Sequence, residues 1–180
     1  MTDEASDAAE AAAVDDQELR GGVIVGVVPG QSTRVLAEGA RYARLLGAPL
    51  IVVHVDVTRF VTYEDPDGYV HSAPIDMNIA SGEADFEKVQ TTAQTFLEGH
   101  DLRWTVRQLV GDPAMSIKHL AEKVDAKLIV VGTRKRGLGE SIREFFTGSV
   151  AARLAHRQHR AILVVPLGEP VPDDEEIWPA

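Results

Sequence analysis

Glycine, serine and basic residues gather in one stretch of the sequence between Val131 and Val150. Without a side chain, glycine lets backbone N–H groups approach a phosphate closely, and a serine at a helix start adds a hydroxyl donor. The basic residues add positive charge that favours an anion. We therefore predict an anion-binding loop here, although a basic surface loop without a ligand has the same composition. The residues that carry this prediction are Gly132, Thr133, Arg134, Lys135, Gly148, Ser149 and Val150.

Other chemistries find little support in the sequence. The chain has no cysteine, which excludes disulfides and thiolate metal sites. His156 and His159 lie three residues apart with no third ligand in an evident pattern, so we interpret them as solvated histidines at a helix end. No serine is paired in the sequence with a credible base and acid. We predict no metal site and no catalytic residues.

Continuous apolar, β-branched runs alternate with segments of helical periodicity along the chain, which is typical of a parallel sheet covered on both faces. We predict strands over residues 21–28, 49–56, 103–109, 127–131 and 161–165. We predict helices over residues 33–46, 83–99 and 113–124, and from about Ser141 onward with Gly148 and Ser149 inside the last one. Residues 57–82, with Pro66, Gly68 and Pro74, are interpreted as a long irregular loop.

This pattern predicts an α/β fold with a five-stranded, parallel, doubly wound sheet in the order 3-2-1-4-5. In such a sheet, ligands bind beyond the carboxyl ends of the strands, where the strand order reverses. That rule places Val28–Ser32 and Gly132–Ser149 at the expected site.

The negative charge of the chain lies in its two ends. The 180 residues carry a net charge of -10, yet residues 1–20 hold seven acids and one base, and residues 166–180 hold five acids and no base. The middle is left with 16 acids and 17 bases, which argues against binding to nucleic acid or to an anionic membrane. We therefore expect a disordered acidic tail over residues 1–20, one domain over residues 21–166 and an acidic tail over residues 167–180.

Several features indicate a cytoplasmic protein. No apolar run reaches the roughly 18 residues of a membrane span, and the N-terminus lacks the basic and apolar regions of a signal peptide. The absence of cysteine also favours an intracellular compartment.

The arrangement of motifs resembles the universal stress protein family. The Gly132-Thr133-Arg134 start, the Gly148-Ser149-Val150 segment and the closing strand Ala161–Pro166 are similar to the C-terminal signature of that family. Val23–Val27 fits its first strand, and Val110–Pro113 fits the turn before its third helix. The resemblance covers about residues 21–166.

The resemblance implies a Rossmann-like fold of the adenine nucleotide alpha hydrolase-like type, and a homodimeric stress-response module that binds ATP or a related nucleotide. Val28 and Val55 then join the glycine-rich residues as nucleotide-binding positions. The dimer interface that the resemblance implies lies on the last strand, whose residues Ile162, Leu163, Val164 and Val165 form an unprotected edge.

The sequence also departs from the family pattern. The second glycine of the family motif falls on Lys135, and twelve residues instead of nine separate Lys135 from Gly148. The family's nucleotide-contacting aspartate falls on Val28, followed by Pro29-Gly30-Gln31 in place of the usual turn. Besides nucleotide binding, two alternatives therefore stay open. One is an interaction protein of the same fold without a nucleotide, and the other is a weak ATP hydrolase using Asp112, Glu140 or Glu144.

Overall fold

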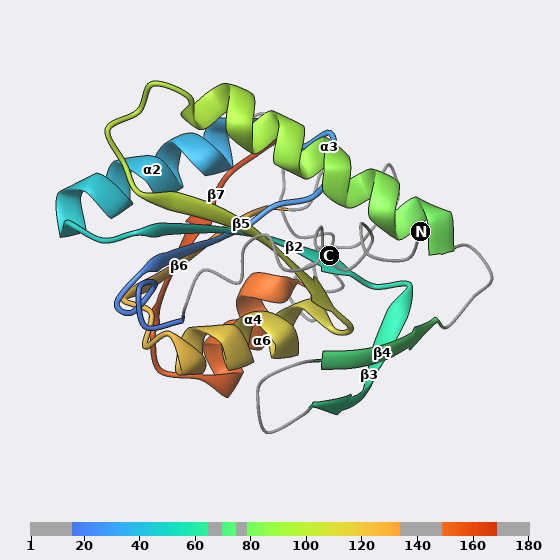
Figure 1. Ribbon diagram of the computed structural model, residues 1–180. Coiled ribbons are helices and arrows are strands. Elements are labelled where there is room, and N and C mark those ends of the chain that lie inside the picture. The colour runs from blue at the N-terminus through green and yellow to red at the C-terminus, as the bar shows by residue number, and fades with distance from the viewer. Residues whose placement is uncertain (1–15, 65–69, 75–78, 134–148, 169–180) are drawn as a thin grey trace, which may run out of the picture.

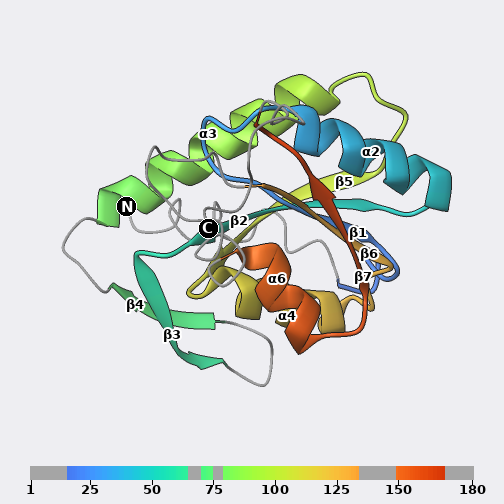
Figure 2. The same ribbon diagram turned by 180° about the vertical axis from the view of Figure 1, so that it is seen from behind.

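The computed structural model describes residues 16–64, 70–74, 79–133 and 149–168 (Figure 1). One parallel sheet runs through the middle, with α2 and α3 on one face and α4 and α6 on the other (Figures 1 and 2). The elements, in chain order, are β1 (Val23–Gly26), α2 (Arg34–Leu46), β2 (Leu50–Asp56), β3 (Arg59–Glu64), β4 (Val70–Pro74), α3 (Ile79–Leu97), β5 (Trp104–Val110), α4 (Pro113–Lys123), β6 (Leu128–Gly132), α6 (Val150–Arg157) and β7 (Ala161–Val165).

The strand order of the main sheet is β5-β2-β1-β6-β7, with every pair parallel. Counted within this sheet, the order is 3-2-1-4-5, so the predicted doubly wound fold is confirmed. The chain moves outward from β1 to β2 and β5 on one side, and to β6 and β7 on the other. The carboxyl ends of β1 and β6 therefore meet where the strand order reverses, which is the usual ligand position in such sheets.

The apolar strand runs of the sequence are explained by two cores, one on each face of the sheet. Val25, Val52 and Val130 point toward α2 and α3, whereas their neighbours Ile24 and Ile129 point toward α4 and α6. All five side chains are fully buried. Because side chains alternate between faces, a central strand covered on both sides must be apolar at every position.

The predicted C-terminal signal of α2 and N-terminal signal of α4 are confirmed. Gly47 ends α2 in the left-handed conformation with φ of 58°. Asp112 caps α4 by accepting a hydrogen bond from Met115 N at 3.0 Å, and Pro113 occupies the first turn. Helix α3 begins at Ile79, four residues before the predicted start at 83.

The prediction of an irregular loop over residues 57–82 is wrong. Strands β3 and β4 pair there as an antiparallel hairpin, with an irregularity in register between Val61 and Tyr63. The hairpin lies on the same side of the sheet as α4 and α6 (Figures 1 and 2). Pro66 and Gly68, which indicate a loop, fall between the two strands in the sequence and lie outside the described residues. The irregular register breaks the alternation by which a strand pair is recognised in sequence.

The expected domain boundary at residue 21 is also too late. Leu19 is only 1% exposed and packs in the core beside α4, and Asp16 pairs with Arg107 of β5 and Lys123 of α4. Residues 16–20 therefore belong to the folded domain. Composition could not reveal this, because one buried leucine does not change the polar average of a segment.

Within the described ranges, no helix combines the length and the apolar character needed to cross a membrane.

Candidate functional site

The segment after β1 is a tight turn that sits where the strand order reverses. The backbone N–H of Gln31 donates to the carbonyl oxygen of Val28 at 3.2 Å, and Gly30 has φ of 68°. Proline at the second position and glycine with positive φ at the third define a type II turn. The side chain of Gln31 forms a second hydrogen bond across the turn, in which Val28 N donates to Gln31 Oε1 at 3.1 Å. Two hydrogen bonds and a proline make this segment a fixed feature of the site.

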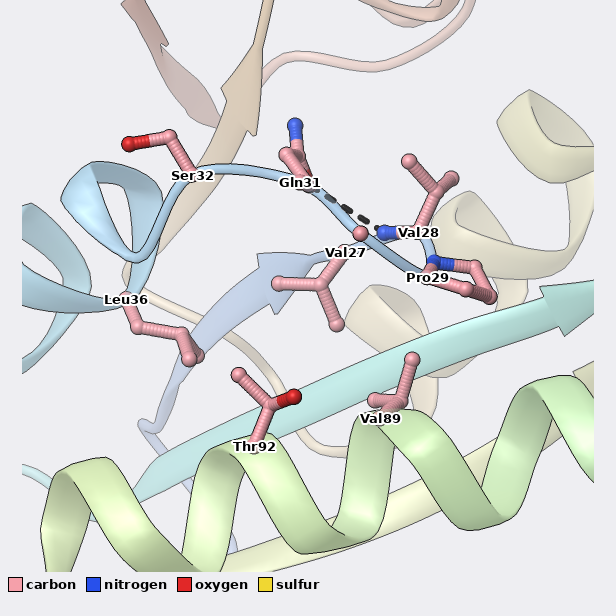
Figure 3. A pocket seen from close by; sticks show the side chains of 9 residues that line it. Val27, Val28, Pro29, Gln31, Ser32, Leu36, Val89 and Thr92 are labelled. Carbon is pink, nitrogen blue, oxygen red and sulfur yellow. Dashed lines mark hydrogen bonds between the residues drawn. The ribbon is translucent and has the colours of Figure 1, made fainter.

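An open hollow lies between this turn and α3 (Figure 3). Its empty volume is about 290 Å³, including space open to solvent. The hollow is therefore a shallow depression and not an enclosed cavity. The lining is mostly apolar, with side-chain polar groups from Gln31, Ser32 and Thr92. The lining residues are Val27, Val28, Pro29, Gly30, Gln31, Ser32, Leu36, Val89 and Thr92. Such a surface suits the apolar face of a small molecule.

Gly132, predicted to face a phosphate, ends β6 beside the turn. A Cβ at this position would lie 2.4 Å from Gln31 Nε2, 2.6 Å from Leu167 Cδ1 and 3.0 Å from Val35 Cγ2. Real Cβ atoms do not approach other atoms so closely, so a side chain here would push aside the ends of Gln31 and Leu167, and packing within the chain already favours glycine. The lack of a side chain at Gly132 therefore has a structural reason that needs no ligand.

Thr133 joins the end of β6 to the chain that follows β7. Its backbone N–H donates to the carbonyl oxygen of Val165 at 2.9 Å, and its Oγ1 accepts from Leu167 N at 2.8 Å. Leu167, placed in the C-terminal tail by composition, is thus hydrogen-bonded to the domain and packs against its core.

Ser149 was predicted to lie inside a helix, and this is wrong. It is the N-cap of α6, with ψ of 138°, and its Oγ accepts from Ala152 N at 3.0 Å. A hydroxyl that accepts one hydrogen bond still has a hydrogen to donate, so Ser149 keeps a donor at the start of α6. Val150 is the first residue of α6 and is half-buried against the core on that side of the sheet.

The predicted residues Arg134, Lys135 and Gly148 lie outside the described residues. Among the others, Val28 is 59% exposed and offers no carboxylate to a ligand. Val55 is half-buried, and its side chain packs in the core on the side of α4, the face of the sheet opposite the hollow. Its side chain is therefore turned away from the hollow.

Asp112, a candidate base for a hydrolase, has both carboxylate oxygens engaged. Oδ1 accepts from Met115 N, and Oδ2 pairs with Arg153 Nη2 of α6 at 2.6 Å. Burial alone would raise the pKa of Asp112, but the hydrogen bonds from Arg153 and from backbone N–H groups outweigh it and hold the pKa below its usual value. A carboxylate of low basicity with two partners is poorly suited to take a proton from water.

Asp56 is a buried acid at the carboxyl end of β2 that sequence reasoning missed. It is 4% exposed, and its Oδ1 accepts from Thr58 N at 2.8 Å and Thr58 Oγ1 at 2.6 Å. It also packs against Gly82 of α3, where a Cβ would lie 2.4 Å from Asp56 Oδ2. The Asp-Val-Thr sequence is an available signal, because an aspartate often accepts from the residue two positions on. Asp56 thus ties together β2, the entry to the hairpin and α3.

Metal ligation finds no support in the part of the chain that the structure describes. No three histidine, aspartate or glutamate side chains gather there in a group that could hold a metal ion. His156 and His159 are both exposed at the end of α6 and just after it.

Comparison with known proteins gives one family. Residues 20–166 match the model of the universal stress protein family. No curated protein matches the chain. Among solved structures, a universal stress protein from Archaeoglobus fulgidus is 25% identical, with a TM-score of 0.55 and coverage of 80% of this chain and 97% of that one.

Two further solved structures were obtained with nucleotides. The universal stress protein from Archaeoglobus fulgidus in complex with dAMP is 21% identical, with a TM-score of 0.55 and coverage of 82% of this chain and 98% of that one. A universal stress protein in complex with cAMP is 24% identical, with a TM-score of 0.53 and coverage of 83% and 99%. At these identities, both comparisons support the fold of this chain.

Proposed function

The chain belongs to the universal stress protein family, and on this basis we propose that it is a cytoplasmic, homodimeric stress-response module that binds ATP or a related nucleotide and is not an enzyme. The observation that carries the proposal is the position of the turn, the hollow and Gly132 together at the carboxyl ends of β1 and β6. The complexes of two relatives with dAMP and cAMP support a nucleotide as the ligand.

In this proposal, the base and ribose occupy the hollow, and the phosphates lie toward Gly132, Thr133 and Ser149. Ser149 supports this assignment, because its hydroxyl group can still donate a hydrogen bond at the start of a helix, where an anion is favoured. Arg134 and Lys135 follow directly in the sequence. Hydrogen bonds from such charged groups each contribute about 1.5–3 kcal/mol.

The first prediction is that phosphates dominate the affinity. Because Val28 supplies no carboxylate to the nucleoside, ATP, GTP and tripolyphosphate should bind within about tenfold of one another, which corresponds to about 1.4 kcal/mol. High salt should weaken all three, since screening reduces attraction between the phosphates and basic residues. Titration calorimetry at low and high salt measures both effects. A strong preference for ATP over GTP would contradict the prediction and indicate a specific adenine contact.

A protein–protein interaction module that binds no nucleotide is the second candidate. Two observations favour it: Val28 stands where the family's acid is expected, and the side chains of Gln31, Leu167 and Val35 account for Gly132 without a ligand. The absence of both heat and thermal stabilisation with all three ligands would support this candidate.

A weak ATP hydrolase is less well supported, because both oxygens of Asp112 are engaged, and Glu140 and Glu144 lie outside the described residues.

We propose that the homodimer forms through β7, which lies at one edge of the sheet with β6 as its only neighbour among the described strands. Val164 is 44% exposed, and Ile162 and Leu163 are half-buried. Val165, also expected at the interface, is 3% exposed because its side chain packs in the core. It can therefore contribute to pairing only through its backbone.

The second prediction tests this interface. Val164→Lys places a charge on the proposed contact surface, and charged residues on an edge strand oppose pairing. We expect the variant to sediment as a monomer at micromolar concentrations, where the wild type sediments as a dimer. Leu45→Lys is the matched control, because Leu45 is 69% exposed at the C-terminal end of α2 and lies outside the proposed contact strand. A monomeric wild type, or equal effects of the two substitutions, would argue against the interface.

A further inference from the structure

The carboxamide of Gln31 is held in one orientation. The backbone N–H of Val28 is a donor, so the atom of Gln31 that lies 3.1 Å from it must be the acceptor Oε1. The amide nitrogen Nε2 therefore points the other way, away from Val89 and Thr92 in the hollow (Figure 3). It lies beside the end of β6, where a Cβ on Gly132 would be 2.4 Å from it.

Among the residues that the structure describes, this nitrogen is a donor without an acceptor. A carboxamide nitrogen carries two hydrogens, and within the described ranges the only hydrogen bond of the Gln31 side chain is the one that Oε1 accepts from Val28. The residue as a whole is half-buried and lines the hollow. An oriented donor of this kind, held by a turn at the point where the strand order reverses, is suited to bind an acceptor atom of a ligand.

The surroundings point to the kind of acceptor. The turn itself offers no charged acceptor, since Val28, Pro29 and Gly30 precede Gln31. On the other side stands Gly132, where the basic segment of the sequence begins. An oxygen that carries negative charge is the acceptor that forms the strongest hydrogen bond with such an N–H donor.

We propose that Gln31 Nε2 donates a hydrogen bond to a phosphoryl oxygen of the ligand and so selects ligands that carry a phosphate. The inference rests on the proposed function, because it assigns a contact within the same site. Where the family pattern has an aspartate at the position of Val28, this turn instead presents a donor on Gln31. Phosphate-bearing ligands gain from the change, and nucleosides without phosphate do not.

The substitution Gln31→Glu separates the two roles of this side chain. Glutamate has the same shape and can still accept from Val28 N, so the turn is preserved. The donor, however, becomes a carboxylate oxygen that repels phosphate. Gln31→Glu should therefore weaken binding of ATP and of tripolyphosphate about tenfold or more, and leave adenosine binding unchanged. Gln94→Glu, an exposed position on α3, makes the same change of charge and is the control.

A direct readout comes from the side-chain amide signals of Gln31 in ¹H–¹⁵N NMR spectra of the full chain, assigned by their absence in Gln31→Glu. Titration with tripolyphosphate or ATP should shift this pair of signals, whereas adenosine should not. Circular dichroism and melting temperatures confirm that each variant is folded before affinities are compared.

The outcomes distinguish this inference from the proposed function. If ATP binds the wild type and Gln31→Glu equally and the Gln31 signals stay in place, the inference is wrong and nucleotide binding stands. If tripolyphosphate shifts the signals and the variant weakens it, but neither ATP nor GTP binds, Gln31 holds phosphate and nucleotide recognition is wrong. If none of the three ligands perturbs the spectrum, both are overturned.

Discussion

Gly132 shows how one residue type can satisfy two different demands. In the sequence, it marks the start of a phosphate-binding motif, since glycine lets a ligand approach the backbone. In the structure, the side chains of Gln31, Leu167 and Val35 already occupy the space that a Cβ would take. All three partners are distant in the sequence, so the packing reason could not be read from the motif. The position of Gly132 at the site was predictable, and its structural role was not.

The third prediction follows from this crowding. Gly132→Ala should destabilise the fold by about 1–3 kcal/mol, because overpacking forces neighbouring side chains to move. Urea denaturation measures the free energy of unfolding. Gly168→Ala is the control: its Cβ would meet nothing within 4 Å, and we expect a change within about 0.5 kcal/mol. Equal stability of Gly132→Ala and the wild type would mean that Gln31 and Leu167 can move aside easily.

At the scale of elements, the cap of α4 also holds α6. Asp112 uses one carboxylate oxygen to cap its own helix and the other to pair with Arg153, and Ser149 caps α6 one turn before that arginine. The cap itself was predictable, because an aspartate followed by proline is a common helix start. The ion pair was not, since it joins residues that only the fold brings together.

The fourth prediction separates these two contributions. Asn is as good an N-cap as Asp, so Asp112→Asn removes the ion pair alone and should cost at most about 1 kcal/mol, as is usual at a surface. Asp112→Ala also removes the cap and should cost about 0.5–2 kcal/mol more. Thermal and urea unfolding at neutral pH give both values.

Acid supplies an independent check on Asp112. Because its pKa is below the usual value of 3.8 in the folded protein, the carboxylate stabilises the fold above that value and loses its contribution as the pH falls through the folded pKa. The stability difference between wild type and Asp112→Asn should therefore shrink below about pH 4. A difference that stays constant down to pH 2 would exclude an ionic contribution.

The elements themselves were predictable to different degrees. The five strands of the main sheet could be recognised because burial on both faces demands uninterrupted apolar residues. The hairpin β3–β4 could not, because its turn signals and irregular register resemble those of a loop. The role of Ser149 could not be predicted either, because a serine fits a helix interior or an N-cap until its hydrogen bond to Ala152 N is known.

At the scale of the whole molecule, the segment before β1 covers part of the sheet together with the four described helices α2, α3, α4 and α6. On the face of α4 and α6, Leu19 fills the core beside Ile51 and Val53 of β2, next to the edge strand β5. Asp16 meets Arg107 of β5 and Lys123 of α4. The segment before β1 therefore completes a layer that the helices leave open, and the domain begins earlier than charge and composition indicate.

The fifth prediction tests this segment by deletion. Removing residues 1–15 and 169–180 should leave the free energy of unfolding nearly unchanged, because these stretches are acidic and contain few large apolar residues. Removing residues 1–19 should destabilise the domain strongly, because Leu19 is lost from the core. Leu19→Ala in the full chain isolates that contribution, and truncation of a buried leucine typically costs about 2–5 kcal/mol.

The ion pairs of Asp16 should make part of this segment's contribution to stability depend on pH, whereas the packing of Leu19 should not. Burial alone would raise the pKa of Asp16, but hydrogen bonds and charges of Arg107 and Lys123 outweigh it, so the pKa lies below its usual value of 3.8. The carboxylate therefore stabilises the fold above that value and ceases to do so as the pH falls through the folded pKa. Asp16→Asn should lose stability near neutral pH and approach the wild type in acid, whereas the deficit of Leu19→Ala should persist at every pH. If the deficit of Asp16→Asn also persists in acid, it does not come from the ion pairs with Arg107 and Lys123, and the ionic account of this attachment is wrong.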